Sequence, residues 1–195
     1  MLNALRRISV KYPLALAVLF CVSVAFAQNT NSATKESAAG PAKDPVASSL
    51  RMLLPRSEHN IEGAVEAMPA DKFSYKPTPE QMTFAHLVVH IIESNNGLCA
   101  KAADVPAPKV QEPKESESKD QLLSALRASF AFCNEALGKM NDSKLGDEVE
   151  LFGGRQFPRA MAALAVASGW ADHYGAAAMY LRLNGILPPT AQHQH

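Results

Sequence analysis

Apolar residues recur at three- and four-residue steps through most of this chain, in four segments that proline-containing stretches separate. This spacing puts apolar side chains on one face of an α-helix, whereas a half-buried strand would show alternation. The segments run from Pro45 to about Ala67, from a cap at Thr83 to about Ala102, from Lys119 to Met140 and from Pro158 to Asn184. Four helices that each bury one face predict an all-α fold, a four-helix bundle.

The connections between these segments differ in length. Val105–Ser118 carries three prolines among charged residues, and a connection of more than a dozen residues is expected to span the bundle rather than turn tightly. Asp147–Phe157 alternates briefly and contains Gly153-Gly154, which predicts an extended loop or a hairpin. Asp44 is expected to cap the first helix and Gly185 to end the fourth.

The amino-terminal residues have the pattern of an export signal. Three basic residues precede the apolar run Leu14–Phe26, and Ala25-Phe26-Ala27 ends it with small residues, so cleavage is expected before Gln28. An apolar run of about 13 residues is short for a membrane span. Residues 1–27 are therefore interpreted as a signal peptide for export, to the periplasm or the medium, with no stable membrane anchor after cleavage; an uncleaved anchor is the alternative.

The mature chain divides into three parts. Residues 28–44 are small and polar, which predicts a flexible spacer, residues 45–189 form the bundle, and residues 190–195 are expected to be a disordered tail. Without the leader the chain has 16 basic and 19 acidic residues, so its bulk charge does not favour nucleic acid as a partner.

Several ordered phrases of the sequence carry a resemblance to a known family. They are Met68–Asp71, Lys76–Glu80, Phe84–His90, Asp172–Gly175, Tyr180–Gly185 and Pro188-Pro189. From about Ser48 to Pro189 the chain resembles the DinB-like family, and most closely its exported branch. The resemblance implies an up-down-down-up bundle with a long crossover between helices two and three. It also implies a divalent metal, commonly nickel or zinc, bound by three histidines near one end.

The resemblance transfers only two of these three metal ligands. His90 matches the histidine of helix two, and His173 matches the second histidine of helix four, in His173-Tyr174-Gly175. The first helix-four ligand falls on Gly169. Because His86 lies four residues before His90, it shares that helix face, which allows either a site of His86, His90 and His173 or a weak site of two histidines. Core or surface histidines without metal are the alternative.

The same resemblance bears on the two cysteines that remain after export. In the family topology helices two and three run in parallel, so Cys99 and Cys133 approach the same end of the bundle. An oxidising compartment then permits a Cys99–Cys133 disulfide. The alternative is two inert buried thiols.

Three classes of function follow. The first is a metal-dependent hydrolase or thiol transferase, as in parts of the family, acting on an unidentified small molecule. The second is a non-catalytic ligand-binding module that has lost the metal site, and Gly169 favours this class. The third is an interaction protein that forms a homodimer through its helix faces. No catalytic residue is assigned by the sequence.

Overall fold

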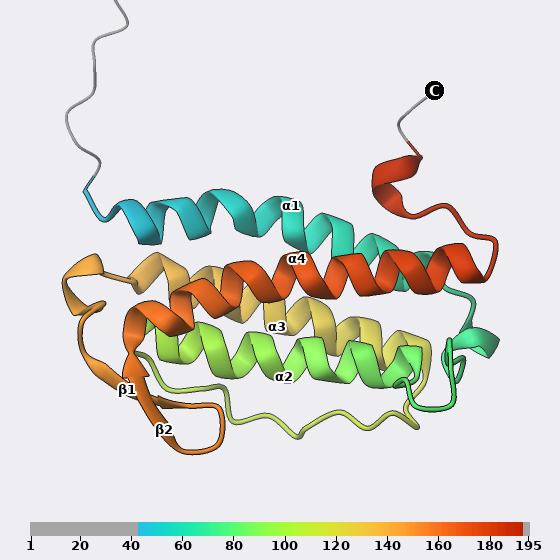
Figure 1. Cartoon of the computed structure of the whole chain (residues 1–195), viewed down its shortest axis with the longest axis horizontal. Helices are drawn as coiled ribbons and strands as arrows, with labels where there is room; N and C mark the ends of the chain where they lie inside the picture. The colour runs from blue at the N-terminus through green and yellow to red at the C-terminus, as the bar shows by residue number, and fades with distance from the viewer. Residues whose placement is uncertain (1–42, 193–195) are drawn as a thin grey trace, which may run out of the picture. The chain divides into compact units, whose positions relative to one another are not determined.

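Four long helices form the structure of the domain, a computed structural model that describes residues 43–192 (Figure 1). The helices are α1 (Pro45–Ala67), α2 (Phe84–Ala103), α3 (Lys119–Lys139) and α4 (Arg159–Leu183). Their limits lie within one or two residues of those expected from the apolar spacing, so the predicted four-helix bundle is confirmed.

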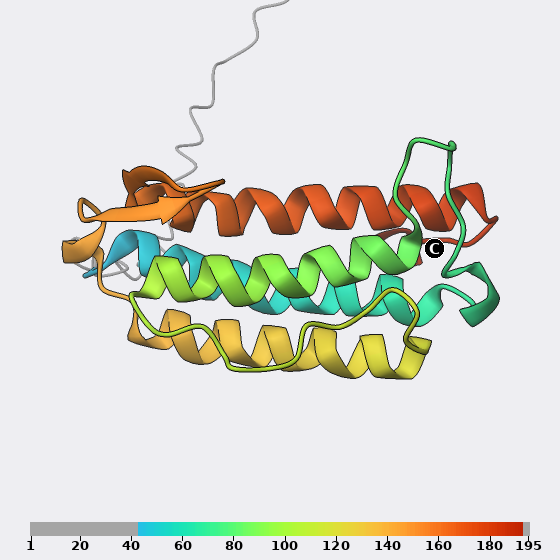
Figure 2. The same ribbon diagram turned by 90° about the horizontal axis from the view of Figure 1, so that it is seen from below.

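The order of the helices in space places α4 between α1 and α2. α2 packs against α3 and α4, and α1 packs against the same two helices, so α3 and α4 lie diagonally across the bundle. α1 and α4 run in one direction and α2 and α3 in the other, which is an up-down-down-up arrangement (Figure 1). The crossover 104–118 runs back along the bundle to connect the parallel helices α2 and α3 (Figure 2).

The core is apolar and draws on all four helices. α2 contributes mainly branched apolar residues to it, and α4 contributes several alanines together with Trp170, Tyr180 and Leu181. The largest fully buried side chains are Phe84, Phe130, Leu54, Ile61, Met68, Ile91, Ile92, Leu122, Leu126, Leu137, Leu181 and Val65.

Side chains accept hydrogen bonds from the free backbone N–H groups at the starts of α1, α2 and α3. At α1 the side chain that does so is not the one expected from the sequence. Thr83 accepts a hydrogen bond from the backbone N–H of His86, and Ser118 forms a capping box at the start of α3. Asp44 was expected to cap α1, but its side chain makes no cap hydrogen bond there. The carboxylate of Asp142 accepts from the backbone N–H groups of Val46 and Ala47 instead, at 2.7 and 2.9 Å.

A short hairpin precedes α4. Its strands β1 (Glu148–Leu151) and β2 (Arg155–Pro158) pair antiparallel, as the alternating stretch predicted. Val149 and Leu151 of β1 are buried against the bundle. The turn between the strands contains Phe152, Gly153 and Gly154, all with positive φ. The two glycines adopt this conformation without strain, whereas Phe152 at φ 46° does not.

The predicted disulfide is present. Cys99 of α2 and Cys133 of α3 are bonded, with their Cα atoms 5.3 Å apart, and both are fully buried. The parallel course of these two helices brings the cysteines to the same height, although 34 positions separate them in sequence.

The chain after α4 turns back onto the bundle. Gly185, at φ 74°, ends the helix as expected, and a 3₁₀ turn η3 (Pro189–Ala191) follows. The hydroxyl groups of Tyr174 and Thr190 lie 2.8 Å apart, so the first residues of the expected tail contact α4 rather than leave the bundle. The interpretations of residues 1–27 as a leader and of most of 28–44 as a spacer, and the end of the tail, lie outside the described residues. Among the described helices, none is both long and apolar enough to cross a membrane.

Candidate functional site

Two of the predicted histidines lie next to each other between α2 and α4. The ring centres of His90 and His173 are 5.0 Å apart, and the ring planes meet at 84°. His90 is exposed, while His173 is only 8% exposed. The structure therefore brings the helix-two and helix-four imidazoles together in one place.

His173 is held as a neutral imidazole. Burial lowers its pKa from 6.5 to about 4, and the nearby imidazole of His90 acts in the same direction, against the opposing effect of the Asp172 carboxylate. Its Nδ1 atom is buried and has no hydrogen-bond partner among the described residues. A buried nitrogen without a partner is uncommon in folded proteins and suggests a place for a further polar group.

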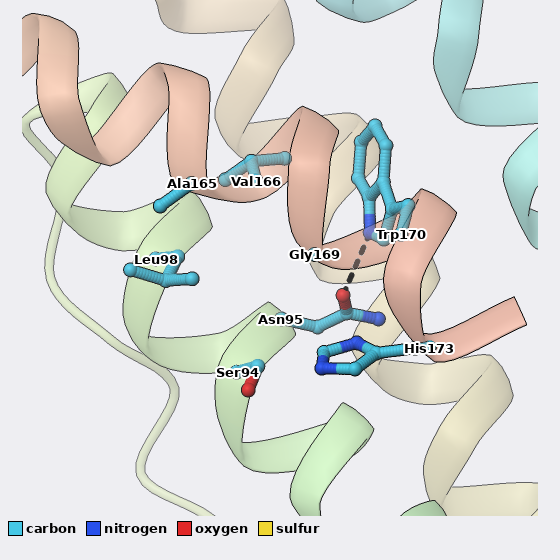
Figure 3. A pocket seen from close by; sticks show the side chains of 8 residues that line it. All are labelled: Ser94, Asn95, Leu98, Ala165, Val166, Gly169, Trp170 and His173. Atoms are coloured by element: carbon cyan, nitrogen blue, oxygen red, sulfur yellow. Dashed lines mark hydrogen bonds between the residues drawn. The ribbon is translucent and has the colours of Figure 1, made fainter. Parts of the chain in front are cut away.

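A chamber of about 10 Å³ lies beside this nitrogen (Figure 3). A Cβ atom built on Gly169 would lie 3.6 Å from Cε1 and 3.9 Å from Nδ1 of His173, so Gly169 leaves the space into which that side of the ring faces. The volume matches about one water molecule. Eight residues of α2 and α4 line the chamber: Ser94, Asn95, Leu98, Ala165, Val166, Gly169, Trp170 and His173.

The chamber is the deep end of a larger opening, which we call the histidine cleft. The cleft has a volume of about 410 Å³ and shares five lining residues with the chamber. His90, Asp172 and Ser168 add polar groups to its wall, and Phe152 of the hairpin turn adds an aromatic edge. Asp172 also lines a neighbouring, mainly apolar groove of about 580 Å³, so the two depressions meet at this carboxylate.

The floor of the chamber is fixed by a buried hydrogen-bond network centred on Asn95. Its Oδ1 accepts from Nε1 of Trp170 at 2.9 Å, and its Nδ2 donates to Oγ of Ser129 at 3.0 Å (Figure 3 draws the first bond). Ser129 in turn donates to the backbone carbonyl of Leu126. The network joins α2, α3 and α4, and sequence reasoning missed it. The available signal was a lone Asn on the apolar face of a helix.

The third predicted metal ligand, His86, makes a different contact. Its Nδ1 donates to Oε1 of Glu115 on the crossover at 2.6 Å, and Thr83 donates to the other carboxylate oxygen at 2.8 Å. These two hydrogen bonds lower the pKa of the Glu115 carboxyl, with His86 as the larger cause. His86 thus fastens the crossover to the start of α2.

The donors present do not fit a three-histidine metal centre. Two imidazoles lie side by side, glycine occupies position 169, to which the resemblance assigns the third ligand, and Nδ1 of His86 is already engaged. Within residues 43–192, no set of three or more His, Cys, Asp or Glu side chains is grouped so as to hold a metal ion. A catalytic zinc usually has three protein ligands, so the arrangement supplies too few.

Together these features describe a four-helix bundle whose second and fourth helices carry a histidine cleft. Residues 53–177 match the DinB superfamily, which is more than half of the chain. The protein belongs to this family, as the ordered phrases of the sequence had indicated. A comparison with curated proteins finds no match.

Solved structures support the same fold. A DinB-like protein from Bacillus subtilis is 18% identical, with a TM-score of 0.58 over 75% of this chain and 99% of the other. A DinB-like protein from Bacillus cereus is 16% identical, with a TM-score of 0.59 over 73% of this chain and 95% of the other. At this level of identity the likeness concerns the fold alone.

Proposed function

We propose that this protein is an exported DinB-like domain that binds a small molecule in the histidine cleft and has no complete catalytic metal centre. The observation that carries the proposal is Gly169, which leaves a chamber of about 10 Å³ where the family places a third imidazole. The leader over residues 1–27 supports export, to the periplasm or the medium.

The shape of the cleft supports binding. Its volume of about 410 Å³ falls in the range of small-molecule sites, roughly 300–1,000 Å³. Like such sites, it combines apolar walls with a few convergent polar groups, here His90, His173 and Asp172. The buried network around Asn95 holds the inner wall in one arrangement, which lowers the cost of ordering the site when a ligand binds.

A weak divalent-metal site is the second candidate function. It is favoured by the proximity of His90 and His173, and by the neutral state of His173, since a metal-binding imidazole must be unprotonated. Nickel or zinc would then have two imidazoles from the protein. Hydrolase or thiol-transferase activity has less support, because two ligands are one fewer than catalytic zinc sites usually have.

The test uses tag-free mature protein that begins at Gln28. Elemental analysis after dialysis is expected to find well under one equivalent of nickel or zinc. Retention of about one equivalent, lost in His90→Ala, would replace the proposal with the second candidate.

Binding is tested in parallel with a panel of small aromatic amines, carboxylates and alcohols, by following backbone amide chemical shifts. Members of the panel are expected to shift resonances of the cleft, and Ala165→Phe is expected to suppress the shifts because Ala165 lines both the cleft and the chamber. Ala125→Phe on α3 is the matched control, a partly buried alanine diagonally across the bundle. If no compound of any class perturbs the cleft, the binding proposal is wrong.

A further inference from the structure

In the part of the chain that the structure describes, Asp172 is the one acidic residue that lines the histidine cleft. Asp172 is exposed on α4 and forms no ion pair with the described residues. Of the described residues, no lysine or arginine lines the cleft or the adjoining groove. A carboxylate in a mainly apolar depression without a cation attracts a positively charged group and repels a negative one.

Phe152 lines the histidine cleft together with Asp172. Its side chain is 57% exposed, although it continues a strand whose other apolar residues, Val149 and Leu151, are buried. Its φ of 46° is costly for a bulky residue, and backbone strain of this kind clusters at binding sites. The ring packs edge-on against Phe157, with centroids 5.8 Å apart, so one side of the ring is supported.

The remaining polar groups of the cleft can accept hydrogen bonds. His90 and His173 are imidazoles, Ser94 and Ser168 are hydroxyls, and the buried Nδ1 of His173 has no partner among the described residues. An alkylammonium has three donors and no acceptor, so it matches a wall of this composition.

From these observations we propose that the histidine cleft binds a primary amine that carries an aromatic ring. The ammonium pairs with Asp172 and the ring packs against Phe152. This inference rests on the proposed binding function and specifies its ligand class. The adjoining groove, which begins at Asp172 and is lined by Pro77, Gly175 and Met179, leaves room for a further apolar substituent on the amine.

Three probes with the same phenyl ring and a two-carbon chain separate charge from shape: phenethylamine, phenylacetate and 2-phenylethanol. Trp170 is the single tryptophan of the chain and lines the chamber, so its fluorescence responds to a probe that reaches the deep end of the cleft. Phenethylamine is expected to bind about tenfold more tightly than 2-phenylethanol, the effect of one charge-assisted hydrogen bond, and phenylacetate more weakly than either.

Variants assign the effect to named residues. Asp172→Asn is expected to abolish the roughly tenfold preference for phenethylamine while leaving 2-phenylethanol unchanged. Phe152→Ala is expected to weaken all the probes that bind. Glu135→Gln is the matched control, because it removes the same charge from an exposed position on α3, diagonally opposite α4.

Three results would overturn the inference. The first is binding of phenylacetate or 2-phenylethanol as tight as that of phenethylamine, and the second is an unchanged preference in Asp172→Asn. Absence of binding by all three probes at about 10 mM also contradicts it, because a dissociation constant above that value corresponds to a binding free energy of less than about 3 kcal/mol. In each case other members of the wider panel still decide whether the cleft binds small molecules at all.

Discussion

Gly169→His tests whether the histidine pair is one side chain short of a metal centre. Position 169 lies one helical turn before His173, on the same face of α4, and a Cβ atom there meets the His173 ring at ordinary contact distances of 3.6 and 3.9 Å. A third imidazole at this position would therefore stand beside the other two without a backbone clash.

The expected magnitudes separate helix propensity from metal binding. Gly169→Ala should stabilise the domain by up to about 1 kcal/mol through helix propensity alone, and Gly169→His by less because histidine is a weaker helix former. With zinc at about 100 times its dissociation constant, Gly169→His should gain about 2.7 kcal/mol more. For a domain of about 150 residues this corresponds to a rise in Tm of roughly 5–11 °C.

The assay is thermal unfolding followed by circular dichroism, with zinc and with chelator, for the wild type, Gly169→Ala and Gly169→His. Adding His90→Ala to Gly169→His should remove the zinc-dependent gain. If Gly169→His responds to zinc no more than Gly169→Ala does, the two native imidazoles are not oriented toward a common ion, and the account of Gly169 as a missing ligand is refuted.

Three further predictions concern stability. Cys99→Ala with Cys133→Ala should cost about 3–4 kcal/mol in urea unfolding, because the crosslink closes a 34-residue separation. Because the pKa of His173 is about 4 in the folded state and 6.5 ordinarily, the unfolded chain binds the extra proton as pH falls between these values. Stability should therefore fall by up to about 3 kcal/mol over that window, a slope that calorimetry should find missing in His173→Gln. Asp142→Ala should cost about 1–2 kcal/mol in urea unfolding, by removing the cap of α1.

The helices were predictable because the residues that specify each helix lie within or next to it in the sequence. Apolar spacing and proline punctuation located all four, and Thr83 and Gly185 marked two ends correctly. The prediction that Asp44 caps α1 was wrong, although an Asp directly before a proline at a helix start is a pattern typical of a cap. The actual cap, Asp142, comes from nearly 100 positions away, and no local pattern connects it to α1.

The site was predictable only in part, for the same reason. Family resemblance located His90 and His173 and showed Gly169 as the departure. It did not reveal that Glu115, on the crossover, engages His86, since a loop residue has no periodicity to place it. The contribution of Phe152 was also hidden, because its exposure depends on a left-handed backbone conformation at the hairpin turn.

The amide of Asn95 has a consequence for how such a protein diversifies. One side chain ties three helices together, so a substitution that reshapes the inner wall disturbs the packing of the whole bundle. The hairpin turn takes no part in this hydrogen-bond network. New ligand preferences in close homologues should therefore arise at position 152, while Gly153 and Gly154 keep the positive φ of the turn and the helical floor stays the same.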